Sequence, residues 1–136
     1  MTPLSVNAPP QRQRFGSSVQ VVLVAAPRTL LQRMSAMVGT IEGTVLAGAF
    51  EAAADAIDWL VWKRPVWHVA YVDMTLPGAD DVVLSLQGSR HGGTIVGVCA
   101  HLWHEERERC SAIGVQDIVE KGDLLAFQDE LEARSR

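Results

Sequence analysis

Short apolar runs alternate along this chain with longer amphipathic stretches. The apolar runs are rich in Val, Ile and Ala, and turn residues bound them, which is typical of strands that are covered on both faces. They predict strands at residues 20–24, 44–49 and 68–73, and a further strand after the turn residues 89–93. The pattern therefore indicates a sheet whose strands are separated by helix-length connections.

The amphipathic stretches carry apolar residues at helical spacing, and Gly or Pro interrupts them. They predict helices at residues 27–38, 51–63, 79–86, 103–113 and 123–133. Three of these stretches have predicted inner sides, namely Leu30, Leu31, Met34, Met37 and Val38, then Ala53, Ala54, Ile57, Leu60 and Val61, then Leu124, Leu125, Phe127 and Leu131. Strict alternation of strands and helices predicts an α/β fold with a doubly wound parallel sheet, right-handed crossovers and helices on both faces.

Composition limits the class of protein further. The 136 residues are 48% hydrophobic and fit one domain, for which we take residues 19–136. Residues 1–18 hold three prolines and few apolar side chains, so we predict a disordered N-terminal arm. A net charge of −4 argues against nucleic-acid binding. The sequence shows neither a signal peptide nor a membrane span, and we expect a cytoplasmic protein without membrane contact.

Asp73 is the residue best placed for chemistry. It ends an apolar predicted strand and precedes the turn residues Pro77 and Gly78. Open α/β sheets bind ligands outside the carboxyl ends of their strands. The alternative is a solvated acid that caps a turn, which is common for Asp.

The segment from Val72 to Gly78 resembles the phosphorylation strand and loop of response-regulator receiver domains, and Lys121 stands where that family has an invariant lysine. Residues 19–26, 94–101 and 114–121 look like the first, fourth and fifth strands of the family, so the resemblance covers nearly the whole chain after residue 18. It implies a CheY-like (flavodoxin-like) fold with five parallel strands in the order 2-1-3-4-5 and five helices. It also implies that Asp73 is the phosphoacceptor position, served in the family by a histidine kinase.

The sequence departs from the family at four positions. Ala25 and Ala26 replace the acidic pair that holds magnesium. Cys99 replaces the Ser or Thr that binds a phosphoryl oxygen, and Ile118 replaces the aromatic residue of the fifth strand. With Asp73 as the remaining carboxylate, we expect magnesium binding to be weak or absent, no cofactor, and phosphotransfer to be lost or impaired. The remaining site would be an ion pair between Asp73 and Lys121.

Cys99 allows two other interpretations, a redox switch and a zinc ligand, because His101, His104 and Cys110 are close in sequence. The spacing is not a standard zinc pattern, and no base for a reactive thiol is evident. We therefore interpret Cys99 as a small buried residue that replaces a hydroxyl, and we predict no metal site.

The predicted fourth helix offers candidate interface residues, Trp103, Glu105 and Arg109. In the family, the surface of the fourth helix, fifth strand and fifth helix contacts partners or a second copy.

The chain ends soon after its last helix, and no nucleophile with a base supports an enzyme. The sequence thus predicts a stand-alone, non-enzymatic atypical receiver (pseudo-receiver) in two-component phosphorelay signalling. It would act by protein–protein interaction with a histidine kinase, a downstream protein or itself. The alternatives are a working phosphoacceptor at Asp73 and a small-molecule sensor whose pocket lies at Ala25 and Ala26.

Overall fold

The computed structural model describes residues 18–90 and 92–136. The predicted N-terminal arm lies outside the described residues, except for Ser18. The described residues alternate between strands and helices as the sequence predicts. The order is β1 (Val19–Val24), α1 (Arg28–Thr40), β2 (Thr44–Phe50), α2 (Ala53–Lys63), β3 (Val69–Asp73), α3 (Ala79–Gln87), β4 (Thr94–Cys99), α4 (His104–Ala112), β5 (Asp117–Glu120) and α5 (Leu124–Ser135).

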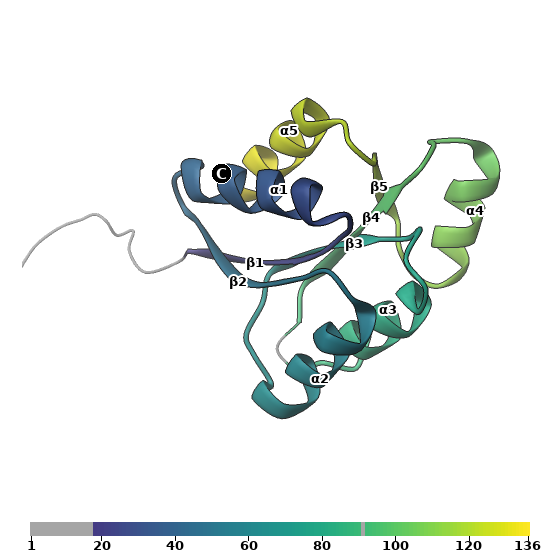
Figure 1. Ribbon diagram of the computed structural model, residues 1–136, viewed down its shortest axis with the longest axis horizontal. Coiled ribbons are helices and arrows are strands. Elements are labelled where there is room, and N and C mark those ends of the chain that lie inside the picture. The colour runs from purple at the N-terminus through teal and green to yellow at the C-terminus, as the bar shows by residue number, and fades with distance from the viewer. Residues whose placement is uncertain (1–17, 91) are drawn as a thin grey trace, which may run out of the picture.

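The strands form one parallel sheet in the order β2-β1-β3-β4-β5, which confirms the predicted topology (Figure 1). The chain places β2 on one side of β1 and β3 on the other, so the connections run in opposite directions from this point of the sheet. In open α/β sheets, the crevice at such a switch point is where ligands bind. Asp73 ends β3, at the carboxyl edge of this crevice.

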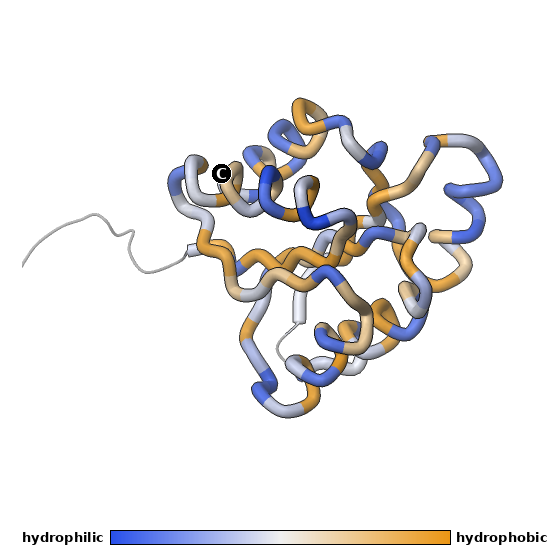
Figure 2. The backbone as a smooth tube through the Cα atoms, viewed as in Figure 1, coloured by the Kyte–Doolittle hydropathy of each residue, from blue (hydrophilic) through white to orange (hydrophobic). Residues whose placement is uncertain are grey.

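Two apolar layers cover the sheet, because side chains of successive strand residues point to opposite faces. Along β1, Val21 and Leu23 pack with α1 and α5, whereas Val22 and Val24 pack with α2 and α3. Figure 1 shows α1 and α5 on one side of the sheet and α2 and α3 on the other. The apolar strands run between these layers in Figure 2, which explains why their sequences lack alternation.

Two predicted helix faces are partly wrong. On α2, Val61 is 57% exposed and Ala54 is exposed, while Ala56 and Leu60 are buried. On α5, Leu125 is 67% exposed. Each of these helices contacts the sheet along a narrow stripe whose central residues are four positions apart in sequence. A residue next to one of them in sequence is rotated by about 100° around the helix axis, away from the sheet. The helical spacing predicted these helices correctly, but the inner faces that it predicted were too wide.

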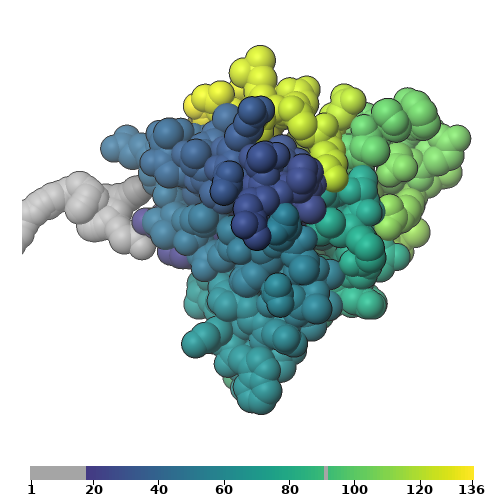
Figure 3. Space-filling view, in the orientation of Figure 1, coloured from purple at the N-terminus to yellow at the C-terminus, as the bar shows by residue number. Residues whose placement is uncertain are grey.

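The helix α4 differs from the others in how it is held. Cys110 is its single buried residue, and the structure describes every residue of this helix. Its remaining side chains are mostly charged, and the helix is coloured largely as hydrophilic in Figure 2. In Figure 3 its residues form a lobe that projects at one side of the molecule. The helix α4 therefore has little apolar contact with the sheet.

The part of the chain that the structure describes contains no helix with the length and apolarity that crossing a bilayer requires.

Candidate functional site

Asp73 is the only charged residue that is fully buried among those the structure describes. The carboxyl end of β3 places it beside the residues that follow β1 and β5. Lys121 follows β5, and its backbone N–H donates to the carbonyl of Cys99 at 2.7 Å. This hydrogen bond fixes the end of β5 against the end of β4. The parallel register thus brings Lys121 to Asp73 from 48 residues away in sequence.

Both carboxylate oxygens of Asp73 already have donors. Lys121 Nζ lies 2.8 Å from Oδ2, and the backbone N–H of Ala26 donates to the same oxygen at 3.2 Å. Thr75 donates to Oδ1 twice, through its backbone N–H at 3.0 Å and its Oγ1 at 2.6 Å. Lys121 Nζ also donates to Thr75 Oγ1 at 2.9 Å. The buried charge is therefore paired and hydrogen-bonded, as a buried carboxylate requires.

The predicted ion pair between Asp73 and Lys121 is present, but sequence reasoning missed Thr75 and the role of the Ala26 backbone. Thr75 is two residues after Asp73, and an Asp that accepts from a backbone N–H two residues on is a known turn arrangement. That spacing could have signalled the contact. The Ala26 contact carries no signal in the sequence, because any residue type supplies a backbone N–H.

Cys99 ends β4 and is buried, as we interpreted it. Its Sγ lies 3.6 Å from Sγ of Cys110 on α4, which is buried as well. Burial raises the pKa of Cys99 to about 12, and the neighbouring Cys110 adds to this shift. His101 does not join the two thiols. It is exposed, and its ring stacks on Trp103 with 4.1 Å between ring centroids.

Arg109 was predicted to be an interface residue, but its guanidinium makes contacts inside the molecule. Nη1 donates to the carbonyl oxygen of Met74 at 3.0 Å, and Nη2 lies 3.1 Å from Oδ1 of Asp80. Met74 follows Asp73 directly, so this one side chain joins α4 to the loop of the candidate site. Its side chain is 44% exposed, which leaves part of it available to a partner.

Solved structures with the same architecture are receiver domains. The receiver domain of the putative response regulator NarL from Mycobacterium tuberculosis is 14% identical, and the match covers 88% of this chain and 98% of that one with a TM-score of 0.73. The response regulator domain of Thermotoga maritima CheB is 12% identical, with 88% and 94% coverage and a TM-score of 0.71. A structure of the CheA3 P1 domain in complex with CheY6 from R. sphaeroides matches at 14% identity. That match covers 88% of this chain and 95% of the other, with a TM-score of 0.70.

The chain has the receiver-domain fold. Because the identities are low, this likeness establishes the fold and not the chemistry of the site. No protein-family model matches the sequence, and no curated protein matches it.

The two positions after β1 that the resemblance to receiver domains assigns to magnesium ligands hold a poor donor set for that ion. Magnesium takes carboxylate oxygens, carbonyl oxygens and water in octahedral geometry. The side chains at positions 25 and 26 are methyl groups, and Ala25 is fully buried. Within residues 18–90 and 92–136, no three His, Cys, Asp or Glu side chains are grouped so that they could hold a metal ion. Lys121 occupies one oxygen of the single carboxylate.

Ile118 lies on β5, and its half-buried side chain packs on the α3 side of the sheet. Its β4 partner is Gly97, where an added Cβ would lie 3.4 Å from the Ile118 side chain. The Ile118 side chain makes apolar contacts beside the β4–β5 pair, and it has no polar group that could form a hydrogen bond at the site.

The predicted surface residues of α4 are exposed. Trp103 precedes the helix and is 62% exposed, and Glu105 is exposed in its first turn. The other tryptophans divide between core and surface, with Trp67 at 1% exposure and Trp62 at 80%. A second exposed tryptophan therefore lies on α2.

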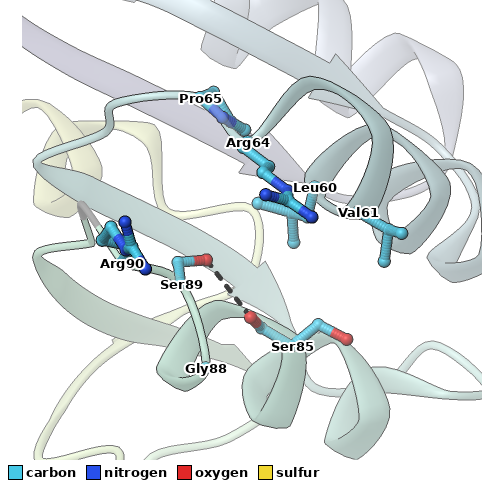
Figure 4. A pocket seen from close by; sticks show the side chains of 8 residues that line it. All are labelled: Leu60, Val61, Arg64, Pro65, Ser85, Gly88, Ser89 and Arg90. Carbon is cyan, nitrogen blue, oxygen red and sulfur yellow. Dashed lines mark hydrogen bonds between the residues drawn. The ribbon is translucent and has the colours of Figure 1, made fainter.

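A cavity of about 530 Å³ lies between α2 and α3 (Figure 4). Residues at the ends of these two helices line it, namely Leu60, Val61, Arg64, Pro65, Ser85, Gly88, Ser89 and Arg90. Ala25 and Ala26 do not line this cavity, so it is not the ligand pocket that the sequence suggested near Asp73.

Proposed function

We propose that this chain is an atypical receiver domain of two-component signal transduction, which acts by protein contact and does not depend on magnesium-assisted phosphorylation. The observation that carries this proposal is the state of Asp73. Three residues occupy both of its oxygens, and neither neighbouring position after β1 supplies a second carboxylate.

Phosphoryl transfer to a carboxylate requires an oxygen that can reach the phosphorus atom and cations around the phosphoryl oxygens. In this chain Oδ1 and Oδ2 are each held by donors on the protein itself. Lys121 is the cation in contact with Asp73, and its ammonium is shared with Thr75. A phosphoryl group would have to displace these hydrogen bonds, and the Lys121 ammonium would be the one positive charge beside it. The site supports a fixed ion pair better than an acceptor.

A fixed ion pair at this place has a structural use. It joins the ends of β3 and β5 and the loop after β3 through one buried contact. Breaking such a contact leaves a buried charge without a partner, which is costly. The pair therefore holds the loops around Asp73 in one arrangement, without a signal that switches them. The module would be non-enzymatic and would bind no cofactor.

The proposed partner surface is formed by α4, β5 and α5. Exposed apolar side chains lie at the start of both helices, Trp103 before α4 and Leu125 on α5. Large exposed apolar side chains are typical of protein contacts. The structure of the CheA3 P1 domain in complex with CheY6 supports the idea that a receiver fold can contact another protein domain. The partner would be a cytoplasmic histidine kinase, a downstream protein or a second copy.

The second candidate is a working phosphoacceptor, which the geometry of Asp73 and Lys121 favours. A lysine ammonium 2.8 Å from the carboxylate can stabilise charge on an incoming phosphoryl group. The two candidates differ in one observable, the covalent state of Asp73 after exposure to a phosphodonor.

The deciding experiment is intact-mass spectrometry after incubation with acetyl phosphate and magnesium, with an Asp73→Asn variant beside it. We expect no phosphoryl mass gain under conditions that modify an ordinary receiver domain in the same tube. A gain in the native protein that disappears in the variant would establish the phosphoacceptor and overturn the proposal. A gain in both would place the phosphoryl group elsewhere.

The partner surface is tested by self-association, measured by sedimentation velocity over a range of protein concentrations. A Trp103→Ala variant should weaken self-association by at least about tenfold, because interface tryptophans commonly contribute that much. Trp62→Ala is the matched control, since Trp62 is 80% exposed on α2. A native protein that is monomeric throughout, or an equal effect of both variants, would exclude a homodimer through this surface.

A further inference from the structure

Two cysteine thiols meet between the sheet and α4. Cys99 ends β4 and Cys110 lies in the last turns of α4, and their sulfur atoms are 3.6 Å apart. Both side chains have 0% exposure. Gly97, two residues before Cys99 on the same face of β4, leaves room for the second thiol. A Cβ at position 97 would lie 3.3 Å from Sγ of Cys110.

While α4 is packed on the sheet, these thiols are protected from solvent and oxidants. Neither is in contact with solvent, and burial raises the pKa of Cys99, so little thiolate forms near neutral pH. Protection lasts only while α4 stays on the sheet. Of the residues of α4, Cys110 alone is buried, and Arg109 adds the polar contacts with Met74 and Asp80. A helix with so little buried surface opens at a small free-energy cost compared with global unfolding.

We propose that Cys99 and Cys110 are a modification site at which a hydroperoxide forms an intramolecular disulfide that ties α4 to β4. An S–S bond is about 2.05 Å long, so the two sulfurs need to approach by only about 1.5 Å. The loop closed between them is short in sequence, and both cysteines already face one another. This inference does not depend on whether Asp73 accepts a phosphoryl group.

The chemistry balances with hydrogen peroxide as the oxidant. When α4 opens, one thiol loses its proton to solvent, and the thiolate attacks a peroxide oxygen. The O–O bond breaks, hydroxide leaves and takes a proton to become water, and the attacking cysteine becomes a sulfenic acid. The second thiol loses its proton, its thiolate attacks the sulfenic sulfur, and the expelled hydroxide takes up a proton to become water. Two thiols and one peroxide thus give one disulfide and two waters.

The disulfide would act on the part of the fold beside the candidate site. Cys99 accepts a backbone hydrogen bond from Lys121, and Arg109 next to Cys110 bonds to the loop after Asp73. The helix that is held least by apolar packing would then be held covalently. Oxidation would suppress the opening of α4 and fix the surface around Trp103.

Intact-mass spectrometry of the full chain after peroxide treatment tests the site. We expect a loss of about 2 Da and a single cross-linked peptide pair in a non-reducing digest, both reversed by dithiothreitol. Cys99→Ser and Cys110→Ser should each abolish the loss, and both variants are checked for folding by circular dichroism. A stable gain of oxygen without the loss, a disulfide between two chains, or two intact thiols after treatment that oxidises the urea-unfolded chain would overturn the proposal.

The role of α4 opening is tested by the rate of disulfide formation. Arg109→Gln removes both polar contacts of that side chain, and it should speed the reaction by about tenfold, which is the scale of one charged hydrogen bond. Arg107→Gln is the matched control on the same helix, because the Arg107 side chain is exposed and makes no hydrogen bond or ion pair with the other described residues. Equal rates for the native protein and Arg109→Gln would overturn an opening of α4 as the route.

Discussion

At the scale of single residues, the fold depends on how one buried charge is neutralised. Asp73 is fully buried, while the side chain of Lys121 is 25% exposed and can reach water. A carboxylate taken out of water is costly unless it is paired and hydrogen-bonded. The four donors around Asp73 meet that requirement, and Lys121 is the only one of them with a charge.

Lys121→Met removes that charge and keeps a long apolar side chain. We expect a loss of about 2 to 3 kcal/mol in the free energy of unfolding, measured by urea titration at neutral pH. The loss arises because Asp73 stays buried without a cation.

The control is the double variant Asp73→Asn with Lys121→Met, which removes both charges. It should recover part of the lost stability, because the amide has no charge to bury and its oxygen can still accept from Thr75. If the double variant is less stable than Lys121→Met alone, the loss does not come from an uncompensated charge.

At the scale of elements, α4 and α3 form a matched pair. Each has nine residues, but α3 buries four of them and α4 buries one. Stability of a helix in a protein comes mainly from packing of its apolar face. The two helices should therefore open with very different free energies.

Hydrogen exchange with peptide-resolved mass spectrometry measures this difference. The amides of α4 should exchange at least about a hundredfold faster than those of α3, which corresponds to roughly 3 kcal/mol in opening free energy. Equal protection of the two helices would show that polar contacts such as those of Arg109 hold α4 as firmly as apolar packing.

At the scale of the whole molecule, two buried acids make stability depend on alkaline pH. Burial raises the pKa of Cys99 from near 9 to about 12, and burial beside Glu130 raises the pKa of Tyr71 as well. The Tyr71 hydroxyl donates to Glu130 at 3.2 Å, and its ring packs edge-on against Phe127. Both groups stay protonated in the folded protein at a pH where they ionise in the unfolded chain.

The direction of this pH dependence follows from the number of protons that the folded and unfolded states bind. Below about pH 9 both states hold these protons, and the full stability is present. Above about pH 9 for Cys99 and above about pH 10 for Tyr71, the unfolded chain releases the proton while the folded protein keeps it, so the free energy of unfolding should fall by about 1.4 kcal/mol per pH unit for each group. Urea titrations from about pH 7.5 to 11 measure this slope. Cys99→Ala and Tyr71→Phe should each flatten it, and an unchanged slope in both variants would contradict this origin.

The sequence by itself determined the elements, the topology of the sheet and the place of Asp73 and Lys121. Apolar periodicity is a local property of the chain, and alternation of strands and helices leaves few ways to arrange a parallel sheet. The resemblance to receiver domains implied the order of the strands and the pairing of Lys121 with Asp73, and the ends of parallel strands do share one edge of a sheet. The substitutions Ala25 and Ala26 could also be read directly, because they are residue identities.

Only the tertiary structure decided which side chains meet across elements. The contact of Cys99 with Cys110, the reach of Arg109 to Met74 and the exposure of Val61 and Leu125 depend on helix rotation and distance from the sheet. A residue one position along a helix turns by about 100°, so periodicity with a broad apolar set does not fix the inner face. Packing of the whole chain sets that rotation, and with it the buried thiol pair.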